Sequence, residues 1–457
     1  MKKILLISLA MSVTAALLLG GPSQGLSEKP AKIDLSWEKI CGEKRFEGVD
    51  LNVPTIAGWR SRKPAWDRAA EFTEKTGATF TVQGWPHVDV YTKMFAESLA
   101  GTGALDFVTG LEITSPLFQQ FAIPLNDYIE RDFGSVEEFK KLFYPGLIDY
   151  YTYDGKVKFI PYHYGGMYIV YRKKLFEDPK EKAAFKAQYG YELAPPKTRQ
   201  QLIDIAKFFT RPEEELWGLV VMGKGPPGGF TVLATIMGAG YNLLDSKTGA
   251  PPFKEPEARK KVIEAVSLWD DLIRKYKVMP PGTAAVAHTH AYEMFVGGHA
   301  AMSFGWYGDY EDRLKSPEII ADIGEVGNCQ FPIPNPEKGG LYMVTWGWGI
   351  HKDCKSPDAA WEFIKWTISR DIQLAQAREA GTASPIMHLN KEAAAKGWIA
   401  MSNLKECERG YLPRDRSTRG WDIIELYWTQ TGAYLAGDLT PEEYVDALIE
   451  GTEKIME

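Results

Sequence analysis

The chain has few cysteines and histidines for its length, and their spacing does not form a metal or redox motif. Its 457 residues include four cysteines and seven histidines. The cysteines are Cys41, Cys329, Cys354 and Cys407. None of them forms the Cys-x-x-Cys pair typical of zinc ligands and thiol redox centres. The group of His288, His290 and His299 has no accompanying carboxylate cluster. We therefore expect no metal site.

Short motifs that carry catalytic machinery are also absent. The chain has no Gly-x-Ser-x-Gly, no His-Glu-x-x-His and no Walker lysine. Gly223-x-Gly225-x-x-Gly228 matches a dinucleotide fingerprint in its letters, but Pro226 and Pro227 lie between the glycines. Proline lacks the backbone N–H with which such a loop binds phosphate. We interpret the segment as a plain loop and expect no cofactor. A pair of catalytic carboxylates, as in a glycosidase, stays an open alternative. The tertiary structure, and not a spacing in the sequence, brings two such carboxylates together.

The chain also lacks an excess of basic charge. Its formal net charge is −7, so no basic surface indicates nucleic-acid binding. Hydrophobic residues make up 45% and charged residues 25%, which is ordinary globular composition. Aromatic residues reach 12%, with 14 tryptophans. This content suits a well-filled core, and it also suits a surface on which carbohydrate rings stack.

The N-terminus predicts a secretory signal peptide. Two lysines follow the initial methionine, and residues 4–21 are apolar or small and carry no charge. Ser23 and Gly25 form a small-x-small pair, so we expect cleavage after Gly25. The alternative is an uncleaved anchor helix, for which the apolar run has borderline length. No cysteine ends the run and no second long apolar run follows, so we expect a soluble periplasmic protein and not a lipoprotein.

Export favours disulfide formation among the four cysteines. Cys329 and Cys354 flank a stretch centred on residues 339–342, which form a natural turn. If the flanking runs pair antiparallel, the two cysteines face each other across strands. We therefore predict a Cys329–Cys354 disulfide, with Cys41 and Cys407 either paired or free.

Strands and helices alternate in the first part of the chain. Strands are predicted at 51–57, 78–82 and 105–109, and helices at 64–75 and 88–99. This order indicates βαβ units and a mostly parallel sheet. Ligands of such sheets lie beyond the carboxyl ends of the strands. Trp59, Trp85 and Glu112 follow strand ends and are therefore candidate ligand contacts.

Several motifs, in their order and spacing, resemble one protein family. The most specific is Phe295-x-Gly297-Gly298-His299-Ala300-Ala301-Met302 followed by Gly305-Trp306, and the other matching stretches are 101–108, 124–129, 158–164, 171–176, 195–198, 346–350 and 356–364. Together they resemble family 1 of the extracellular solute-binding proteins of ABC transporters, the class that includes maltose-binding protein. Arg172 stands where the family usually has asparagine, and Leu105 where a proline is common.

The resemblance implies an α/β two-lobe periplasmic-binding-protein fold. Each lobe would be a mostly parallel sheet flanked by helices, with the ligand cleft between the lobes. The expected division is a signal peptide at 1–25, an N-terminal extension at 26–45, lobe 1 at 46–162 and 333–372, and lobe 2 at 163–332 and 373–457. The crossings between lobes are expected near 162–167, 328–333 and 371–382.

The resemblance also implies a function. The protein would be a monomeric, non-enzymatic receptor that binds a sugar or oligosaccharide and delivers it to an ABC permease in the membrane. The alternatives are a secreted carbohydrate-active enzyme, or a receptor for a polyol, a phosphorylated polyol or a polyamine. Arg60 and Lys224 are basic residues near the expected cleft, so an anionic ligand stays an open alternative.

Candidate ligand contacts follow from the chemistry of sugars, which offer an apolar ring face and a rim of hydroxyls. Aromatic residues at strand ends, at the crossing or between glycines would stack on that face, and polar neighbours would bind the hydroxyls. The predicted stacking residues are Trp59, Trp85, Tyr164, Trp306, Trp348 and Trp421. The predicted polar contacts are Arg60, Glu112, His163 and Asp309.

Overall fold

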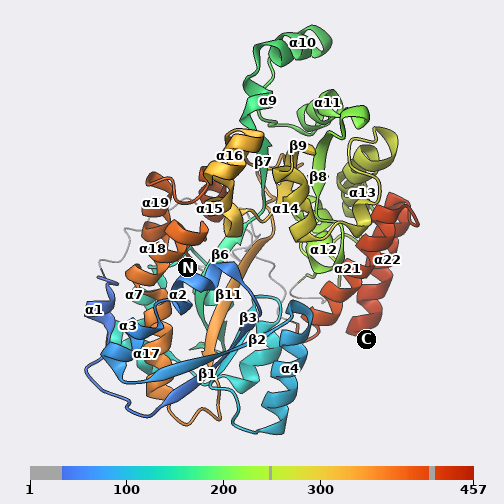
Figure 1. Cartoon of the computed structure of the whole chain (residues 1–457). Helices are drawn as coiled ribbons and strands as arrows, with labels where there is room; N and C mark the ends of the chain where they lie inside the picture. The colour runs from blue at the N-terminus through green and yellow to red at the C-terminus, as the bar shows by residue number, and fades with distance from the viewer. Residues whose placement is uncertain (1–32, 246–249, 411–416) are drawn as a thin grey trace, which may run out of the picture.

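The computed structural model describes residues 33–245, 250–410 and 417–457. The predicted signal peptide at 1–25 lies outside these residues. Figure 1 shows strands gathered at two ends of the molecule, each group surrounded by helices. We call these two parts lobe 1 and lobe 2, and define them by their sheets. The lobe boundaries predicted from the sequence stay a prediction.

Lobe 1 contains two sheets. Strands β1 (Asp50–Ile56) and β2 (Thr79–Trp85) pair in parallel, whereas β11 (Met343–Ile350) lies antiparallel between β3 (Phe107–Leu111) and β6 (Ile160–Gly166). The order β1–helix–β2–helix–β3 agrees with the predicted βαβ units. A short hairpin of β4 (Thr152–Tyr153) and β5 (Lys156–Val157) precedes β6.

Lobe 2 is built on a sheet of the order β10–β7–β9–β8. Its strands are β7 (Tyr168–Arg172), β8 (Trp217–Val221), β9 (Ala300–Gly305) and β10 (Val326–Cys329). The β8–β9 pair is parallel, and β7 runs antiparallel to both of its neighbours, β9 and β10. Met167 alone separates β6 from β7, so the chain passes directly from a sheet of lobe 1 into the sheet of lobe 2.

Each lobe combines parallel and antiparallel strand pairs, where the sequence predicted mostly parallel sheets. The predicted βαβ order concerns neighbours in sequence, whereas β11 enters lobe 1 after a long excursion through lobe 2. A strand that joins a sheet after such a long connection can pair antiparallel with its neighbours. Both partners of β11 are antiparallel to it.

The helices cover the sheets. Around lobe 1 lie α1 (Trp37–Ile40), α2 (Lys63–Trp66), α3 (Ala69–Thr76), α4 (His87–Ala100), α5 (Ser115–Phe118), α6 (Asn126–Phe133), α7 (Val136–Lys140), α8 (Leu147–Tyr150) and α17 (Pro357–Ile368). Lobe 2 carries α9 (Lys173–Glu177), α10 (Pro179–Tyr189), α11 (Arg199–Phe209), α12 (Gly225–Gly238), α13 (Pro256–Asp270), α14 (His288–Val296), α15 (Glu311–Leu314), α16 (Pro317–Ile323), α21 (Gly420–Ala436) and α22 (Pro441–Met456). Three further helices lie beside both lobes: α18 (Arg370–Ala380), α19 (Met387–Ala395) and α20 (Met401–Arg409). In the part of the chain that the structure describes, no helix is both long and apolar enough to cross a lipid bilayer.

The segment 223–228, whose glycine spacing matches a dinucleotide-binding fingerprint, is not the plain loop that we predicted. Helix α12 begins at Gly225, directly after Lys224, and the two prolines occupy its first turn. Proline fits there because N–H groups of the first turn have no partner within the helix.

The predicted Cys329–Cys354 disulfide is wrong. β10, which ends at Cys329, pairs with β7 in lobe 2, whereas Cys354 follows β11 in lobe 1. The flanking runs therefore belong to different sheets and do not form the expected hairpin. Cys41, Cys329, Cys354 and Cys407 are all free thiols.

The two lobes are joined by ion pairs as well as by the chain. Arg60 precedes α2 in lobe 1 and pairs with Asp312 of α15 at 2.7 Å. Arg68 of lobe 1 pairs with Glu379 of α18 at 2.6 Å. Helix α18 packs against both α2 and α15, so it contacts both lobes.

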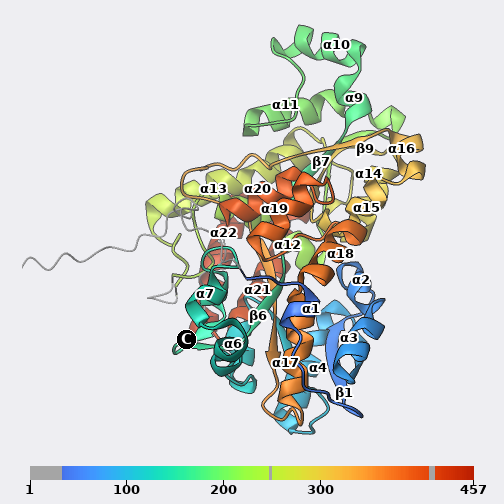
Figure 2. The same cartoon turned by 90° about the vertical axis from the view of Figure 1, so that its left-hand side faces the viewer.

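The N-terminal extension is packed against lobe 1 through α17, as Figure 2 shows for α1. The backbone N–H of Gly42 donates to Glu362 at 2.9 Å, and Lys44 pairs with Asp358 at 2.7 Å. Trp37 is buried and stacks on Phe72. The extension therefore contributes to the core of lobe 1.

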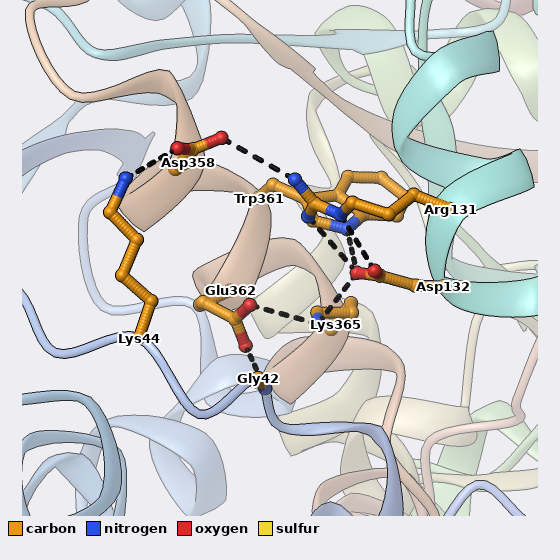
Figure 3. A network of polar contacts seen from close by, with 8 residues as sticks. All are labelled: Gly42, Lys44, Arg131, Asp132, Asp358, Trp361, Glu362 and Lys365. Carbon is orange, nitrogen blue, oxygen red and sulfur yellow. Dashed lines mark hydrogen bonds and ion pairs between the residues drawn. The ribbon is translucent and has the colours of Figure 1, made fainter.

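A buried lysine lies at the centre of this contact (Figure 3). Lys365 is 1% exposed and pairs with Asp132 at 2.8 Å and with Glu362 at 2.9 Å. Burial raises the pKa of Asp132, but hydrogen bonds from Arg131, Lys365 and Trp361 outweigh this effect and lower the pKa to about 2. Asp132 is therefore held as a carboxylate, and Lys365 compensates two acids at once.

Replacement of this lysine should cost much of the stability of lobe 1. Lys365→Met keeps the aliphatic length but leaves Asp132 and Glu362 without their buried cation, so we expect a loss of about 3–5 kcal/mol in the free energy of unfolding. Urea unfolding without ligand measures it. The matched control is Lys44→Met, because its pair with Asp358 is largely exposed and should contribute less than about 1 kcal/mol. Equal losses in the two variants would contradict the argument.

Candidate functional site

A cavity of about 410 Å³ lies between the two lobes. Residues of both lobes contribute to its wall, together with residues of the segment 382–383 and of α20. The lining residues are Ile56, Trp59, Leu111, His163, Tyr164, Gly165, Gly166, Pro227, Phe230, His288, Thr289, Trp306, Gly308, Val344, Trp346, Thr382, Ala383 and Asn403. The volume is in the range of small-molecule sites.

Two tryptophans form the wall of lobe 1. Trp59 follows β1 after Gly58, whose φ of +69° makes a turn that few side chains tolerate. Its ring lies 4.7 Å from the ring of Trp346 and 5.3 Å from that of His163. Tyr91 stacks behind Trp346, with ring centroids 5.9 Å apart. Both tryptophans are thereby held in place by further aromatic rings.

Two rings form the opposite wall, on lobe 2. Trp306 follows β9, and Phe230 lies in the first part of α12. Their rings meet edge to face at 5.1 Å. Phe230 also packs on Tyr342 at 4.4 Å, on the segment that enters β11. The cavity thus has aromatic walls on both sides, one from each lobe.

The cavity has few polar groups, and these are neutral side chains and imidazole rings. Apart from the hydroxyl of Tyr164 and the indole N–H groups of the tryptophans, they are the side chains of His163, His288, Thr289, Thr382 and Asn403. Nδ1 of His163 lies 3.3 Å from the buried guanidinium of Arg62, and Nε2 of His288 lies 3.2 Å from the carbonyl oxygen of Trp306. No carboxylate lines the cavity among the side chains that the structure describes.

Four of the residues predicted from the sequence lie on the cavity. They are Trp59, His163, Tyr164 and Trp306. The structure brings them together from β1, β6 and β9, which belong to both lobes. Their part in ligand binding stays a prediction.

Trp348, which the sequence predicted as a stacking residue, does not line the cavity. Its side chain is fully buried and stacks on Tyr162 at 4.4 Å, in the core of lobe 1. Trp346 lines the cavity instead, two residues earlier on β11. The two side chains point to the same face of the strand, but β11 enters lobe 1 at the carboxyl end of β3, so the earlier tryptophan is nearer the cavity.

Glu112 is also a core residue, contrary to its prediction as a ligand contact. It is fully buried and accepts hydrogen bonds from the hydroxyl of Tyr342 and, at 3.0 Å, from the backbone N–H of Thr345. Burial raises its pKa to about 7, although these two hydrogen bonds act in the opposite direction. It connects β3 to the start of β11.

Three other predicted residues do not line the cavity. Arg60 is engaged by Asp312, and Trp85 ends β2 with its ring near the ammonium of Lys93. Trp421 packs on Tyr91 at 4.5 Å, behind Trp346. Each has a partner that explains its position without a ligand. Asp309 lies beside Gly308 in the short 3-10 helix Gly308–Tyr310, and its side chain is outside the described part of the chain.

Sequence analysis missed Trp346, Phe230, His288, Thr382 and Asn403 as cavity residues. Trp346 stands in the same Trp-Gly-Trp motif as Trp348, and the choice between them needed the pairing of β11. His288 was examined only as a metal ligand. No pattern in the sequence marks Asn403.

The comparisons with known proteins agree with this architecture. The family model described as "Bacterial extracellular solute-binding protein" matches residues 59–374. A maltotriose-binding protein of Pyrococcus abyssi is 23% identical over 252 residues, which are 53% of this chain and 46% of that protein. The alignment therefore spans about half the length of this curated relative.

Solved structures resemble nearly the whole chain. Maltose-bound MalE3 of T. maritima has a TM-score of 0.73 at 20% identity, over 89% of this chain and 100% of that one. A ribitol complex of a solute-binding protein from Agrobacterium radiobacter K84 has a TM-score of 0.73 at 24% identity, over 90% and 100%. A D-mannitol complex from Agrobacterium vitis S4 has 0.70 at 20%, over 90% and 98%. These likenesses confirm the predicted two-lobe α/β fold.

The raised pKa of Glu112 predicts a dependence of stability on pH. The folded state binds this proton up to about pH 7, and the unfolded state loses it near the ordinary value of 4.5. The folded state therefore holds more protons between these values, and the free energy of unfolding should fall as pH rises through this window. Glu112→Gln removes this contribution, so the difference in stability between variant and wild type should change with pH from 4.5 to 7.

Chemical unfolding at a series of pH values from 4.5 to 8 tests this. Glu137→Gln is the control, because Glu137 is 78% exposed, and its profile should run parallel to that of the wild type. Glu406→Gln should behave like Glu112→Gln, since burial also raises the pKa of Glu406 to about 7. A parallel profile for Glu112→Gln would show that the carboxyl group titrates normally.

Proposed function

The chain belongs to the bacterial extracellular solute-binding protein family, and on this premise we propose that it is the solute receptor of an ABC importer for a sugar or oligosaccharide. The observation that carries the proposal is the interlobe cavity with an aromatic wall from each lobe. Trp59 and Trp346 line it from lobe 1, and Trp306 and Phe230 line it from lobe 2. Flat aromatic surfaces suit the apolar face of a sugar ring, and the few polar groups between them suit its hydroxyls.

The two aromatic walls come from different lobes, and this supports a mechanism in which the lobes close on the ligand. A ligand that stacks on both walls makes its full set of contacts only when the lobes are together. It therefore binds the closed form better than the open form, and this difference is what shifts the equilibrium. The direct passage from β6 to β7 at Met167 provides a place for hinge rotation. A permease could then distinguish the closed receptor from the empty one.

The polar groups of the cavity favour an uncharged ligand over the alternatives. A polyamine would bring positive charge, and no described side chain on the cavity is a carboxylate. The same observation weighs against a carbohydrate-active enzyme, whose acid and base are usually two carboxylates. A phosphorylated polyol would rely on His163 and His288, with Arg62 lying behind His163. A neutral polyol stays compatible with the same walls.

Family membership places the protein outside the cytoplasm, and we further propose that it is a periplasmic monomer delivered by its signal peptide. Cleavage after Gly25 would release a mature chain that begins at Leu26. Mass spectrometry of the exported protein tests this prediction. An intact Met1 in the membrane fraction would contradict it, and a lipid-modified N-terminus would contradict the absence of a lipoprotein anchor.

Ligand binding is tested first by thermal shift and then by calorimetry. The panel is maltose, maltotriose, D-mannitol and ribitol, the ligands named for the similar proteins, with spermidine and sorbitol 6-phosphate as charged probes. A ligand at a hundredfold excess over its Kd stabilises by about 2.7 kcal/mol. We expect a shift with at least one uncharged member and none with spermidine. Turnover of an oligosaccharide into products would instead support the enzyme.

Trp306→Ala should weaken binding of the tightest panel member by roughly 30- to 1000-fold, because truncation of a buried aromatic contact costs about 2–4 kcal/mol. Calorimetry measures the affinity, and melting without ligand measures the fold. The matched control is Trp348→Phe, in the core two residues beyond Trp346, which should lower the melting temperature and leave the affinity unchanged. Unchanged affinity in Trp306→Ala would reject the stacking role.

A further inference from the structure

Asn403 lines the cavity although it comes from a helix far along the chain. It belongs to α20, is 2% exposed, and contributes to the cavity wall. Helix α20 packs against β6, β7 and β10, on both sides of the point where the chain passes between the lobes. The side chain therefore reaches the cavity from behind the crossing.

The orientation of its amide is set by two donors. Oδ1 of Asn403 accepts the backbone N–H of Gly166 at 3.3 Å and the thiol of Cys407 at 3.9 Å. The reverse orientation would place the NH₂ group against these two donors. Nδ2 is consequently the outward end of the amide, and no hydrogen bond from it to another described residue occurs.

A glycine keeps this end of the amide open. A Cβ atom on Gly308 would lie 3.2 Å from Nδ2 of Asn403. Gly308 is not among the glycines with positive φ in the described chain, so its backbone does not demand glycine. The space that it leaves in front of Asn403 is a feature of the cavity, which Gly308 itself lines.

Two polar atoms of other residues that line the cavity also lack a partner among the described residues. The hydroxyl of Thr382 and the indole Nε1 of Trp306 are buried, and neither has a hydrogen-bond partner in the described part of the protein. Both residues line the cavity with Asn403. Buried polar groups are normally paired, so these two atoms beside the cavity have hydrogen-bonding capacity that no described protein group uses.

Helix α20 is fixed so that Asn403 cannot turn away. The hydroxyl of Ser402 donates to Oδ1 of Asn328 on β10 at 2.8 Å. One turn later, the carboxylate of Glu406 accepts a hydrogen bond from Gln330 at 2.7 Å. These contacts tie the helix to the second segment between the lobes, and they hold the amide in a prearranged position.

We propose that Asn403 is a specificity-determining residue, whose Nδ2 donates to a hydroxyl or ring oxygen of the bound sugar or polyol, next to Thr382. The assignment rests on the proposed function and adds to it. Asn403 and Trp306 offer N–H donors, and Thr382 offers a hydroxyl that donates or accepts. This set selects a ligand that is rich in acceptor oxygens. A ligand without such oxygens would leave these protein groups unpaired at this end of the cavity.

The test uses the full mature protein with maltose, maltotriose, D-mannitol and ribitol, and monodeoxy analogues of the one that binds tightest. Asn403→Asp keeps the shape and the acceptor for Gly166 but replaces the donor NH₂ by an acceptor oxygen. We expect affinity to fall by about 10- to 100-fold, the effect of leaving one buried hydrogen-bonding group unpaired. For the analogue that lacks the contacted oxygen, wild type and variant should bind equally.

Two further variants separate a contact from a structural effect. Gly308→Ala leaves Asn403 in place but covers Nδ2, and it should weaken binding in the same direction. Asn390→Asp is the matched control, because Asn390 is a fully buried amide of α19 that does not line the cavity and donates to Tyr144 at 2.9 Å. It should lower the melting temperature and leave the affinity of the folded protein unchanged.

The outcomes distinguish this assignment from the function on which it rests. Failure of the wild type to bind any of the four compounds would overturn both. Binding by the wild type with affinity kept within about threefold in Asn403→Asp would overturn the assignment alone. So would an equal loss with every monodeoxy analogue, because no single oxygen would then be the partner of Asn403.

Discussion

The register of β11 between β3 and β6 is the constraint on which the site depends. Trp346 stands directly opposite Leu111 on one side and opposite His163 on the other. All three residues line the cavity. Side chains alternate between faces along a strand, so a slip by one residue would turn Trp346 away from the cavity. The bulge between Trp346 and Gly347 lies at this same point of the pairing with β6.

The wall of lobe 1 is rigid because aromatic rings and a buried cation lie behind it. Trp348 stacks on Tyr162, and the guanidinium of Arg62 lies 4.7 Å from the ring of Tyr162 and 5.2 Å from that of Trp59. Arg62 also contacts His163. Packing of this kind fixes side chains before a ligand arrives, which lowers the entropy lost on binding. The core of lobe 1 and the cavity are thus parts of one aromatic cluster.

The lobes are coupled by contacts between segments that are distant in sequence. The ion pairs Arg60–Asp312 and Arg68–Glu379 join lobe 1 to α15 and to α18. The N-terminal extension also contacts α18, since the backbone N–H of Trp37 donates to Asp371 of this helix at 2.7 Å. Motion of one lobe relative to the other must therefore rearrange charged contacts as well as the strand at Met167.

The sequence by itself determined the class of the protein and much of the local structure. The alternation of strands and helices that the sequence predicts for the start of the chain is present in the structure. The structure also shows side-chain caps that act within one helical turn, at Thr198 and at Thr440. Periodicity and capping act over a few residues, so they can be read along the chain. The order of motifs was sufficient for the family, and Trp59 and Trp306 were identified because a strand end or a glycine marks them.

Only the tertiary structure decided which of several similar residues reach the cavity. Trp346 and Trp348 share a motif and a strand face, and only the depth of β11 in lobe 1 separates a cavity wall from a core. The carboxyl of Glu112 lies one residue from a lining residue but turns into the core towards Tyr342. Asn403 lines the cavity because α20 packs against the crossing and Gly308 leaves space beside it. Contacts between distant segments depend on the register and packing of the whole fold, and local sequence patterns do not encode them.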